Sequence, residues 1–252
     1  MSKPAATRLE NRRIIIFGGG SGIGKATAAL FAREGARLAL VDRNLQAVQD
    51  VAHPLRGLAL QADITDEAQV CAALDAARNA LGGIDGLVIT AGIFDPANLR
   101  DTTPDLWNQV IAVNLTGTYL ICRNALPHLY NSGNATIVTL GSGVALVPPG
   151  PTSAAYVAAK GGVISMSRQI AMEAAPHVRV NCVCPGMVET PMTQSFLKTA
   201  SGESKPEITN NYALKRTATA EEIAAAILFL TSSESSFVTG TTMAVDGGRT
   251  FH

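Results

Sequence analysis

The segment Ile14–Gly24, with the sequence IIIFGGGSGIG, organises the chain. Four apolar residues lead into three glycines at 18–20, and an alanine-rich, helix-like run follows at 25–34. A strand, a glycine turn and a helix in this order leave backbone N–H groups at the helix N-terminus, where the helix dipole favours an anion. Glycine is needed because a side chain would block the ligand or demand an unfavourable φ. The segment therefore predicts a site for the phosphates of a nucleotide.

Two nucleotide-binding motifs compete for this loop. Residues 19–25, GGSGIGK, match a P-loop up to its lysine, but Ala26 follows where a P-loop needs a Ser or Thr hydroxyl for Mg²⁺. The strict dinucleotide fingerprint G-x-G-x-x-G would need a glycine at Ile23. The spacing present is G-x-x-x-G-x-G, for which a glycine-rich turn without a ligand is the alternative. The loop residues expected to contact the cofactor are Gly18, Ser21, Gly22, Ile23 and Gly24.

Length and composition restrict the class of protein. A chain of 252 residues can bury one substantial core, and 47% hydrophobic with 16% charged residues excludes a disordered chain or a coiled coil. A formal net charge of zero argues against a nucleic-acid partner. No apolar run reaches the roughly 18 residues of a membrane helix, and residues 1–13 lack the apolar core of a secretory signal. We expect a cytoplasmic protein with a flexible arm at 1–11 and a single domain at 12–252.

The cysteines and histidines show no metal-binding pattern. Cys182 and Cys184 are two residues apart and face the same side of an expected strand, while Cys71 and Cys122 stand alone. Neither a C-x-x-C pattern nor a Cys/His spacing typical of zinc is present, and the four histidines are scattered. We expect reduced cysteines in the core of a cytoplasmic protein, and no metal.

Short apolar runs alternate with longer helical patterns along the whole chain. This alternation predicts an α/β fold: one doubly wound, Rossmann-type domain, with a mostly parallel seven-stranded sheet and helices on both faces. The expected strands are 13–17, 37–41, 58–61, 86–90, 135–140, 178–183 and 242–245. The expected helices are 22–34, 45–52, 66–81, 104–130 (broken once), 152–175 and 220–230.

Ligands bind parallel sheets at the carboxyl ends of the strands, so the residues there are candidates for a site. Asp42 lies about twenty residues beyond the glycine loop, where a carboxylate accepts hydrogen bonds from an adenosine ribose. Because it repels a 2′-phosphate, it favours NAD over NADP, while Arg43 beside it suits either a phosphate or solvent. Asp63 suits an adenine contact or a plain turn. The other cofactor contacts expected after these strands are Ile64, Ala91 and Gly92.

The pair Tyr156 and Lys160 carries the strongest chemical signal. Four residues apart on a helix, a phenol and an ammonium project from one face. A tyrosine with its ordinary pKa of about 10 is a poor base at neutral pH, and a nearby cation lowers that pKa. Ser142, after the fifth expected strand, adds a hydroxyl at the same edge of the sheet.

With these residues in view, the chain resembles the short-chain dehydrogenase/reductase family from about residue 12 to residue 248. Through this resemblance Asn114 corresponds to the catalytic asparagine, beside Ser142, Tyr156 and Lys160. The C-terminal segments 238–240 and 245–248 resemble those of a subunit interface, which implies a homo-oligomer, with a tetramer favoured. The resemblance also places four residues beside the nicotinamide: Pro185, Gly186, Val188 and Thr190.

The resemblance implies hydride transfer between an alcohol carbon and the nicotinamide of NAD(H). Tyr156 would exchange the hydroxyl proton, and Ser142 would orient the substrate oxygen. Lys160 would lower the pKa of the tyrosine and bind the nicotinamide ribose. Asn114 would anchor a water that links Lys160 to solvent.

Three positions depart from the pattern of the family. Phe17 stands where a threonine usually braces the glycine turn. Ile89 and Thr90 stand in place of two asparagines, so a structural hydrogen bond must come from Thr90 or elsewhere. Ser142 lies fourteen rather than thirteen residues before Tyr156, which one extra residue in the loop 148–151 would explain.

Apolar residues dominate the expected substrate region. They indicate a neutral, fairly hydrophobic small-molecule alcohol or ketone under a lid at about 191–212, although they would also suit simple packing under that lid. The expected substrate contacts are Ser142, Val144, Tyr156, Met187 and Met192. A 3-oxoacyl thioester (acyl-carrier-protein) reductase is the alternative, against which Asp42 and the neutral charge argue. A catalytically silent dinucleotide-binding protein is a further alternative, although all four catalytic residues are present.

Overall fold

A seven-stranded parallel sheet forms the centre of the computed structural model, which describes residues 7–197 and 205–251. The strands lie in the order β3-β2-β1-β4-β5-β6-β7, so the chain winds outward from β1 in both directions. This doubly wound, Rossmann-type sheet confirms the predicted fold class. The strands are β1 Arg13–Phe17, β2 Arg37–Asp42, β3 Leu58–Gln61, β4 Gly86–Ile89, β5 Ala135–Leu140, β6 Val178–Pro185 and β7 Thr242–Val245.

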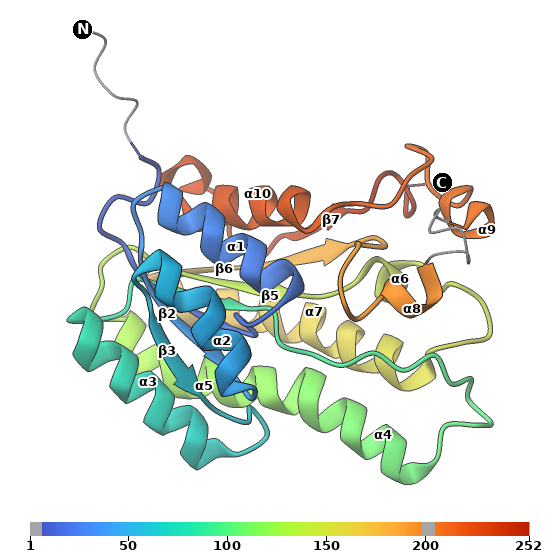
Figure 1. The fold of residues 1–252 in the computed structure, drawn as a ribbon, viewed down its shortest axis with the longest axis horizontal. Helices are drawn as coiled ribbons and strands as arrows, with labels where there is room; N and C mark the ends of the chain where they lie inside the picture. The colour runs from blue at the N-terminus through green and yellow to red at the C-terminus, as the bar shows by residue number, and fades with distance from the viewer. Residues whose placement is uncertain (1–6, 198–204, 252) are drawn as a thin grey trace, which may run out of the picture.

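Helices cover both faces of the sheet, with α1 and α10 above it and α3, α5 and α7 below it in Figure 1. The helices before the sixth strand are α1 Gly22–Arg33, α2 Leu45–Ala52, α3 Glu67–Leu81, α4 Pro104–Ile111, α5 Gly117–Leu129, α6 Gly143–Leu146 and α7 Ala154–Ala174. Those after it are α8 Gln194–Leu197, α9 Pro206–Thr209 and α10 Ala220–Thr231. The short helices α6, α8 and α9 span single turns, too few residues to show a helical period in the sequence.

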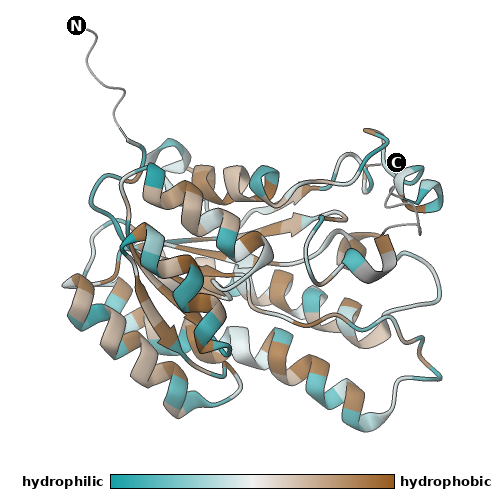
Figure 2. Ribbon diagram, viewed as in Figure 1, coloured by the Kyte–Doolittle hydropathy of each residue, from teal (hydrophilic) through white to brown (hydrophobic). Residues whose placement is uncertain are grey.

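The continuous apolar runs of the strands are explained by burial on both faces. In β1, Ile14 and Ile16 pack with α1, α2 and α10, whereas Ile15 and Phe17 pack with the helices of the other face. All four side chains are fully buried, and each contributes about 1.5–3 kcal/mol through the hydrophobic effect. Figure 2 shows the strands as an apolar layer between helices whose outer faces are hydrophilic.

Among the element boundaries that differ from the sequence prediction, those of β6 and α7 have clear local reasons. β6 continues to Pro185 because β7 pairs with its last residues, Pro185 lying opposite Val245. α7 begins at Ala154 because Ser153 has a left-handed backbone, with φ of 62°.

The helical run at 104–130 is broken by a π-helical segment, Ala112–Thr116, between α4 and α5. Such segments are rare and are frequent at functional sites. Asn114 lies within it, and its amide donates to Val110 O at 3.0 Å. The break therefore places Asn114 where a regular helix would not.

Residues 7–11, the described part of the expected arm, pack against the body of the chain. Leu9 is fully buried, and its N–H donates to Glu34 O at 2.9 Å. The first six residues of that arm lie outside the described residues.

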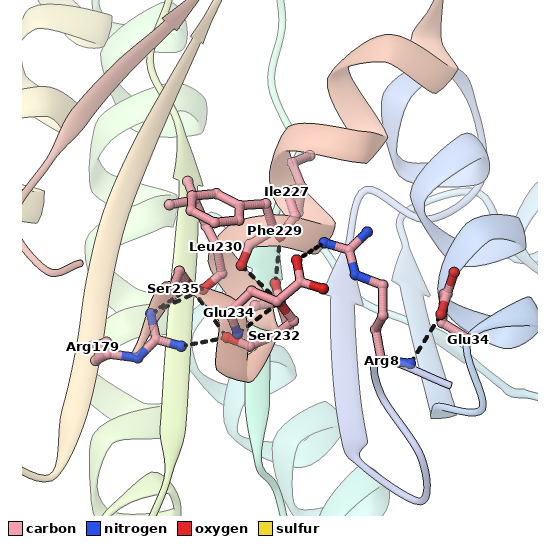
Figure 3. Close-up of polar contacts among 10 residues, drawn as sticks. Arg8, Glu34, Arg179, Ile227, Phe229, Leu230, Ser232, Glu234 and Ser235 are labelled. Carbon is pink, nitrogen blue, oxygen red and sulfur yellow. Dashed lines mark hydrogen bonds and ion pairs between the residues drawn. The ribbon is translucent and has the colours of Figure 1, made fainter. Parts of the chain in front are cut away.

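Two arginines bind the segment that follows α10, away from the site described below. Arg179 Nη2 donates to Ser232 O at 3.0 Å and Arg179 Nη1 to Ser235 Oγ at 2.9 Å, just beyond the C-terminus of α10. Arg8 pairs with Glu234 beside them (Figure 3). Cations at a helix C-terminus complement the helix dipole and its unpaired carbonyls, so this cluster anchors α10. Within the described ranges, no helix is long and apolar enough to cross a membrane.

Candidate active site

A cavity of about 570 Å³ lies at the carboxyl ends of the central strands. Its size is within the range of sites for small molecules and cofactors. All the residues that we expect to be catalytic or to contact the cofactor line its wall, although they come from separate parts of the chain. The cavity therefore coincides with the site predicted from the sequence.

The glycine loop between β1 and α1 forms one wall of the cavity. A Cβ at Gly18, whose φ is +83°, would lie only 2.5 Å from the backbone N of Ala91. Ser21, at the N-cap of α1, makes no side-chain capping bond, which leaves backbone N–H groups of the first turn for a ligand. These features match a cradle for phosphates.

Thr90 supplies the brace that the sequence left open. Its hydroxyl donates to Phe17 O at 2.9 Å and lies 3.2 Å from Gly18 O. It thus ties the end of β4 to the glycine turn, in place of the threonine that the family usually has at position 17.

Asp42 lies against the same loop at the end of β2. Its Oδ2 accepts from Gly20 N at 3.1 Å, and its Oδ1 accepts from Asn44 N at 3.1 Å. Each carboxylate oxygen retains acceptor capacity. Asp42 is therefore held in place at the cavity wall and can still accept hydrogen bonds from a ligand.

Asp63 stabilises the turn that follows β3. Its Oδ1 accepts from the N–H of Thr65 at 2.8 Å and from the Thr65 hydroxyl at 2.7 Å, and these bonds hold its pKa below the usual value. Arg43 also lowers this pKa, so a positive charge lies near the adenine side of the cavity.

Asn114 is fully buried at the floor of the cavity. Its amide donates to Ile93 O at 3.0 Å, and its Oδ1 accepts from Ile93 N at 3.2 Å. A Cβ at Gly92 would lie 2.6 Å from this oxygen. Asn114 therefore fixes the segment after β4 with a matched pair of hydrogen bonds.

Ser142, Tyr156 and Lys160 meet at the end of β5. The Ser142 and Tyr156 side chains both line the cavity, and Ser142 Oγ accepts from Val144 N at 3.4 Å. Lys160 Nζ donates to Leu140 O at 2.9 Å and lies 5.8 Å from the centre of the Tyr156 ring. A serine, a tyrosine and a lysine are thus adjacent, which is the arrangement that proton transfer to or from a hydroxyl requires.

Burial dominates the ionisation of this group. It raises the pKa of Tyr156 to about 12 and lowers the pKa of Lys160 to about 8. The Lys160 ammonium donates to Leu140 O and lies 5.8 Å from the centre of the Tyr156 ring, and its effect on the tyrosine pKa stays a prediction. The Ser142 hydroxyl acts in the opposite direction to burial and lowers the pKa of the phenol.

The segment after β6 forms the far wall. Pro185, Gly186 and Val188 line it, and Val188 pairs with Ala218 in an isolated bridge. Thr190 lies next to Thr193, with their hydroxyl oxygens 3.2 Å apart.

Of the residues predicted to contact the substrate, some line the cavity and others do not. Met192 lines it, whereas Val144 and Met187 do not. The Met187 N–H instead donates to the Tyr212 hydroxyl at 3.0 Å. The cavity wall also includes three residues of α4 and the π-helical segment that the sequence analysis did not predict: Gln109, Ala112 and Val113.

Comparisons with known proteins agree with this geometry. A family model described as enoyl-(acyl carrier protein) reductase matches residues 18–250. A 2-(S)-hydroxypropyl-CoM dehydrogenase 3 of Xanthobacter autotrophicus is 40% identical, over 97% of this chain and 99% of that protein. A meso-2,3-butanediol dehydrogenase of Serratia marcescens is 34% identical, over 96% of each.

A solved structure is similar over the same length. The 3-ketoacyl-(acyl-carrier-protein) reductase of Brucella melitensis, complexed with NADH, superimposes with a TM-score of 0.89. It is 33% identical, and the match covers 96% of this chain and 100% of that chain.

Proposed function

The chain belongs to the short-chain dehydrogenase/reductase family, and on that premise we propose that it is an NAD-dependent oxidoreductase that interconverts a secondary alcohol and a ketone. The convergence of Ser142, Tyr156 and the buried Lys160 on one cavity carries this proposal. Dehydrogenases that act on secondary alcohols, by their names, are among the relatives.

The residues of the cavity suit a nicotinamide dinucleotide. The cradle around Gly18, which a Cβ would fill, and the uncapped start of α1 would hold the pyrophosphate. Asp42 would bind the adenosine ribose, and the segment from Pro185 to Thr190 would line the nicotinamide. When bound, the cofactor accepts or supplies the hydride.

The protein's own residues would handle the proton. Ser142 Oγ would hold and orient the substrate oxygen, and Tyr156 Oη would take the hydroxyl proton during oxidation or return it during reduction. Lys160 would provide positive charge beside the phenol and bind the nicotinamide ribose. Asn114 would anchor a water that passes the proton from Lys160 to solvent.

Position and charge of Asp42 support NAD over NADP. A 2′-phosphate on the ribose would bring negative charge against a carboxylate that is held by Gly20 and Asn44. Arg43 lies close enough to influence Asp63, so the charge near this end of the cavity is mixed.

For the substrate we propose a neutral, fairly hydrophobic small molecule that contacts Ser142, Tyr156 and Met192. Ile93 and Val113 add apolar surface to the cavity, and the Phe94 ring packs edge-to-face on Tyr156. Residues 191–212 would form a lid of the single domain at 12–252; residues 198–204 of this lid lie outside the described residues.

A cytoplasmic homo-oligomer, with a tetramer favoured, completes the proposal. Large apolar side chains stand exposed on helices that flank the sheet, such as Tyr119 on α5 and Met172 on α7. Phe237, between α10 and β7, is also fully exposed. Such surface is typical of subunit contacts.

A second candidate, a 3-oxoacyl thioester reductase, is favoured by the description of the family model and by a relative. The 3-oxoacyl-[acyl-carrier-protein] reductase of Thermotoga maritima is 38% identical over 96% of this chain. An acidic carrier protein would need a basic docking surface, whereas the net charge of this chain is zero.

Initial rates separate these functions. We expect NAD reduction with secondary alcohols, cyclic diols or hydroxysteroids, and weaker activity with NADP. Activity confined to NADPH and a 3-oxoacyl thioester would favour the second candidate, and no turnover with any of them would favour a silent dinucleotide-binding protein.

A further inference from the structure

A tight turn follows the last strand of the sheet and lies beside the far wall of the cavity, because β7 pairs with the end of β6. The buried carboxylate of Asp246 accepts from Gly248 N at 3.0 Å and from Thr250 N at 3.0 Å. The Arg249 N–H donates to Asp246 O at 3.2 Å, which closes the turn. Residues 246–250, the C-terminal turn, are therefore held in one shape and can support neighbouring segments.

Arg249 connects the C-terminal turn to the segment that follows Ser142. Its Nη1 donates to Val147 O at 2.8 Å and to Gly143 O at 3.4 Å. Ser142 and Val147 are the two caps of α6, a helix of one turn. So short a helix is unstable on its own, and a cationic side chain that binds its last carbonyls stabilises it. Arg249 therefore fixes the path of the chain that leaves Ser142.

Tyr212 connects the same turn to the far wall of the cavity. It is buried, with 5% of its surface exposed, and its hydroxyl oxygen accepts from Met187 N at 3.0 Å. A Cβ at Gly186 would lie 2.9 Å from Tyr212 Cε1 and 2.9 Å from Asp246 Cα. The ring and the C-terminal turn thus enclose Gly186 so closely that a side chain would not fit there. Tyr212 therefore lies between the turn and the wall that is expected to face the nicotinamide.

Backbone hydrogen bonds extend this connection along residues 212–218. Leu214 N donates to Gly247 O at 3.0 Å, which attaches the segment to the C-terminal turn. Ala218 N donates to Met187 O at 2.9 Å, which attaches the segment to the far wall. Both polar backbone groups of Met187 are therefore bonded to this one segment, the N–H to the buried hydroxyl and the carbonyl to Ala218.

The C-terminal turn is thus connected to two walls that come from separate parts of the chain. One wall, held through Arg249, begins at Ser142, which is expected to orient the substrate oxygen. The other wall, held through Tyr212, is the segment at 185–190, which is expected to line the nicotinamide. Hydride transfer requires the substrate carbon and the nicotinamide to be aligned, and a misplacement of about 1 Å costs about a hundredfold in rate. The alignment therefore depends on the separation of these two walls.

We propose that Arg249 and Tyr212 are positioning residues, which act through the C-terminal turn to hold the substrate-side and nicotinamide-side walls at a fixed separation. This inference rests on the proposed function, since it concerns the alignment of the alcohol with the cofactor. The pyrophosphate and the adenosine would bind elsewhere, at the glycine loop and Asp42. Loss of either positioning residue therefore lowers the rate more than the affinity for the cofactor.

Substitution of Arg249 tests the substrate-side connection. In Arg249→Ala we expect kcat for alcohol oxidation to fall about tenfold or more, while the Kd of NAD changes by less than about twofold. Arg249→Lys keeps a cationic donor at the carbonyls of α6 and should restore most of the rate. The matched control is Arg33→Ala, at an exposed position near the end of α1, which should keep the wild-type kcat. A wild-type kcat in Arg249→Ala would overturn the inference.

Substitution of Tyr212 tests the nicotinamide-side connection. Tyr212→Phe removes only the hydroxyl that accepts from Met187 N, so kcat should fall about fivefold. Tyr130→Phe, at an exposed position just after α5, is the matched control and should keep the wild-type kcat. When Arg249→Ala and Tyr212→Phe are combined, the loss should be at least about twofold smaller than the product of the single losses, because both residues act through one turn. Losses that simply multiply would overturn the shared role of the turn.

A probe without turnover separates failure of this inference from failure of the proposed function. The fluorescence of bound NADH depends on the surroundings of the nicotinamide and should differ from the wild type in Tyr212→Phe, but not in Tyr130→Phe. ADP-ribose lacks the nicotinamide, so its affinity, measured by calorimetry, should be equal in all three proteins. Tyr212→Phe keeps the buried ring, so it decides the matter if Arg249→Ala fails to fold.

The outcomes are distinct. A wild-type kcat or wild-type NADH fluorescence in Tyr212→Phe would overturn the inference while leaving the dehydrogenase intact. A wild type that binds NAD but oxidises no alcohol would instead refute the proposed function. The NADH fluorescence of Tyr212→Phe would then decide whether Tyr212 holds the nicotinamide-side wall.

Discussion

The hydroxyl of Thr90 donates a hydrogen bond to the carbonyl oxygen of Phe17 across 2.9 Å, and so links the end of β4 to the turn that opens the cofactor loop. Thr90 Oγ1 would also lie 2.6 Å from a Cβ at Gly24, so the hydroxyl fills the space inside the turn. The structure of the loop therefore depends on a residue more than sixty positions away in the sequence.

Removing this hydroxyl should loosen the loop without touching the chemistry. In Thr90→Val we expect the KM for NAD to rise about fivefold, since one buried hydrogen bond contributes about 1 kcal/mol. Thr90→Ser is the matched control and should behave as the wild type. Equal affinities for NAD in all three proteins, measured by titration, would show that the loop does not need the brace.

Asp42 should decide between the two dinucleotides. In Asp42→Ala the loss of a charged hydrogen-bond acceptor should weaken NAD binding by about tenfold to a hundredfold, because such bonds contribute about 1.5–3 kcal/mol. Affinity for NADP should rise relative to NAD, since the repulsion of the 2′-phosphate is removed and Arg43 is left beside the ribose.

The ratio of kcat/KM for NAD to that for NADP is the quantity to measure. Asp50→Ala, at an exposed position on α2, is the matched control and should keep the wild-type ratio. A wild type that prefers NADP would refute the role given to Asp42.

Lys160 should make the stability of the protein depend on pH. Its pKa is about 8 in the folded chain and 10.5 ordinarily, so the unfolded chain binds more protons between these values. The free energy of unfolding should therefore rise with pH through this window, because the folded state is relieved of a buried cation. In Lys160→Met this rise should shrink by up to about 3 kcal/mol.

Urea unfolding at several pH values measures how the free energy of unfolding depends on pH and so tests this prediction. Cys182 contributes a rise of its own between about 7 and its ordinary 9.0, so the informative quantity is the difference between the wild type and Lys160→Met. Identical slopes in the two proteins would mean that Lys160 keeps an ordinary pKa in the folded chain.

Local patterns were sufficient for the fold, and they selected residues that line one cavity. The apolar run at 14–17 predicted a strand buried on both faces, and Ile14 and Ile15 do pack on opposite sides of the sheet. The spacing of Tyr156 and Lys160 placed both on one face of α7, and the cavity includes both. These features follow from periods of two and about 3.6 residues, which a sequence displays directly.

Contacts between segments that are distant in the sequence could not be predicted from local patterns. The sequence predicted that Cys182 and Cys184 are core residues, which their burial confirms, but it could not show that β6 lies in register with β5, with Cys182 opposite Thr139. It placed Val144 and Met187 at the substrate, whereas Gln109 of α4 and Val113 of the π-helical segment line the cavity. The hydrogen bonds between the Asn114 side chain and the backbone of Ile93 likewise join segments about twenty residues apart, which a local pattern does not show.

The most direct test of the proposed mechanism compares the wild type with Tyr156→Phe. The substitution removes only the phenolic oxygen, which holds the transferred proton, and leaves the ring that packs against Phe94. Rates of NAD reduction with a secondary alcohol should fall by about a thousandfold or more, within the range that a general acid–base residue contributes. The affinity for NAD, measured by fluorescence titration, should stay near that of the wild type. A Phe variant that oxidises the alcohol at a near-normal rate would contradict the assignment of Tyr156 and, with it, the proposed mechanism.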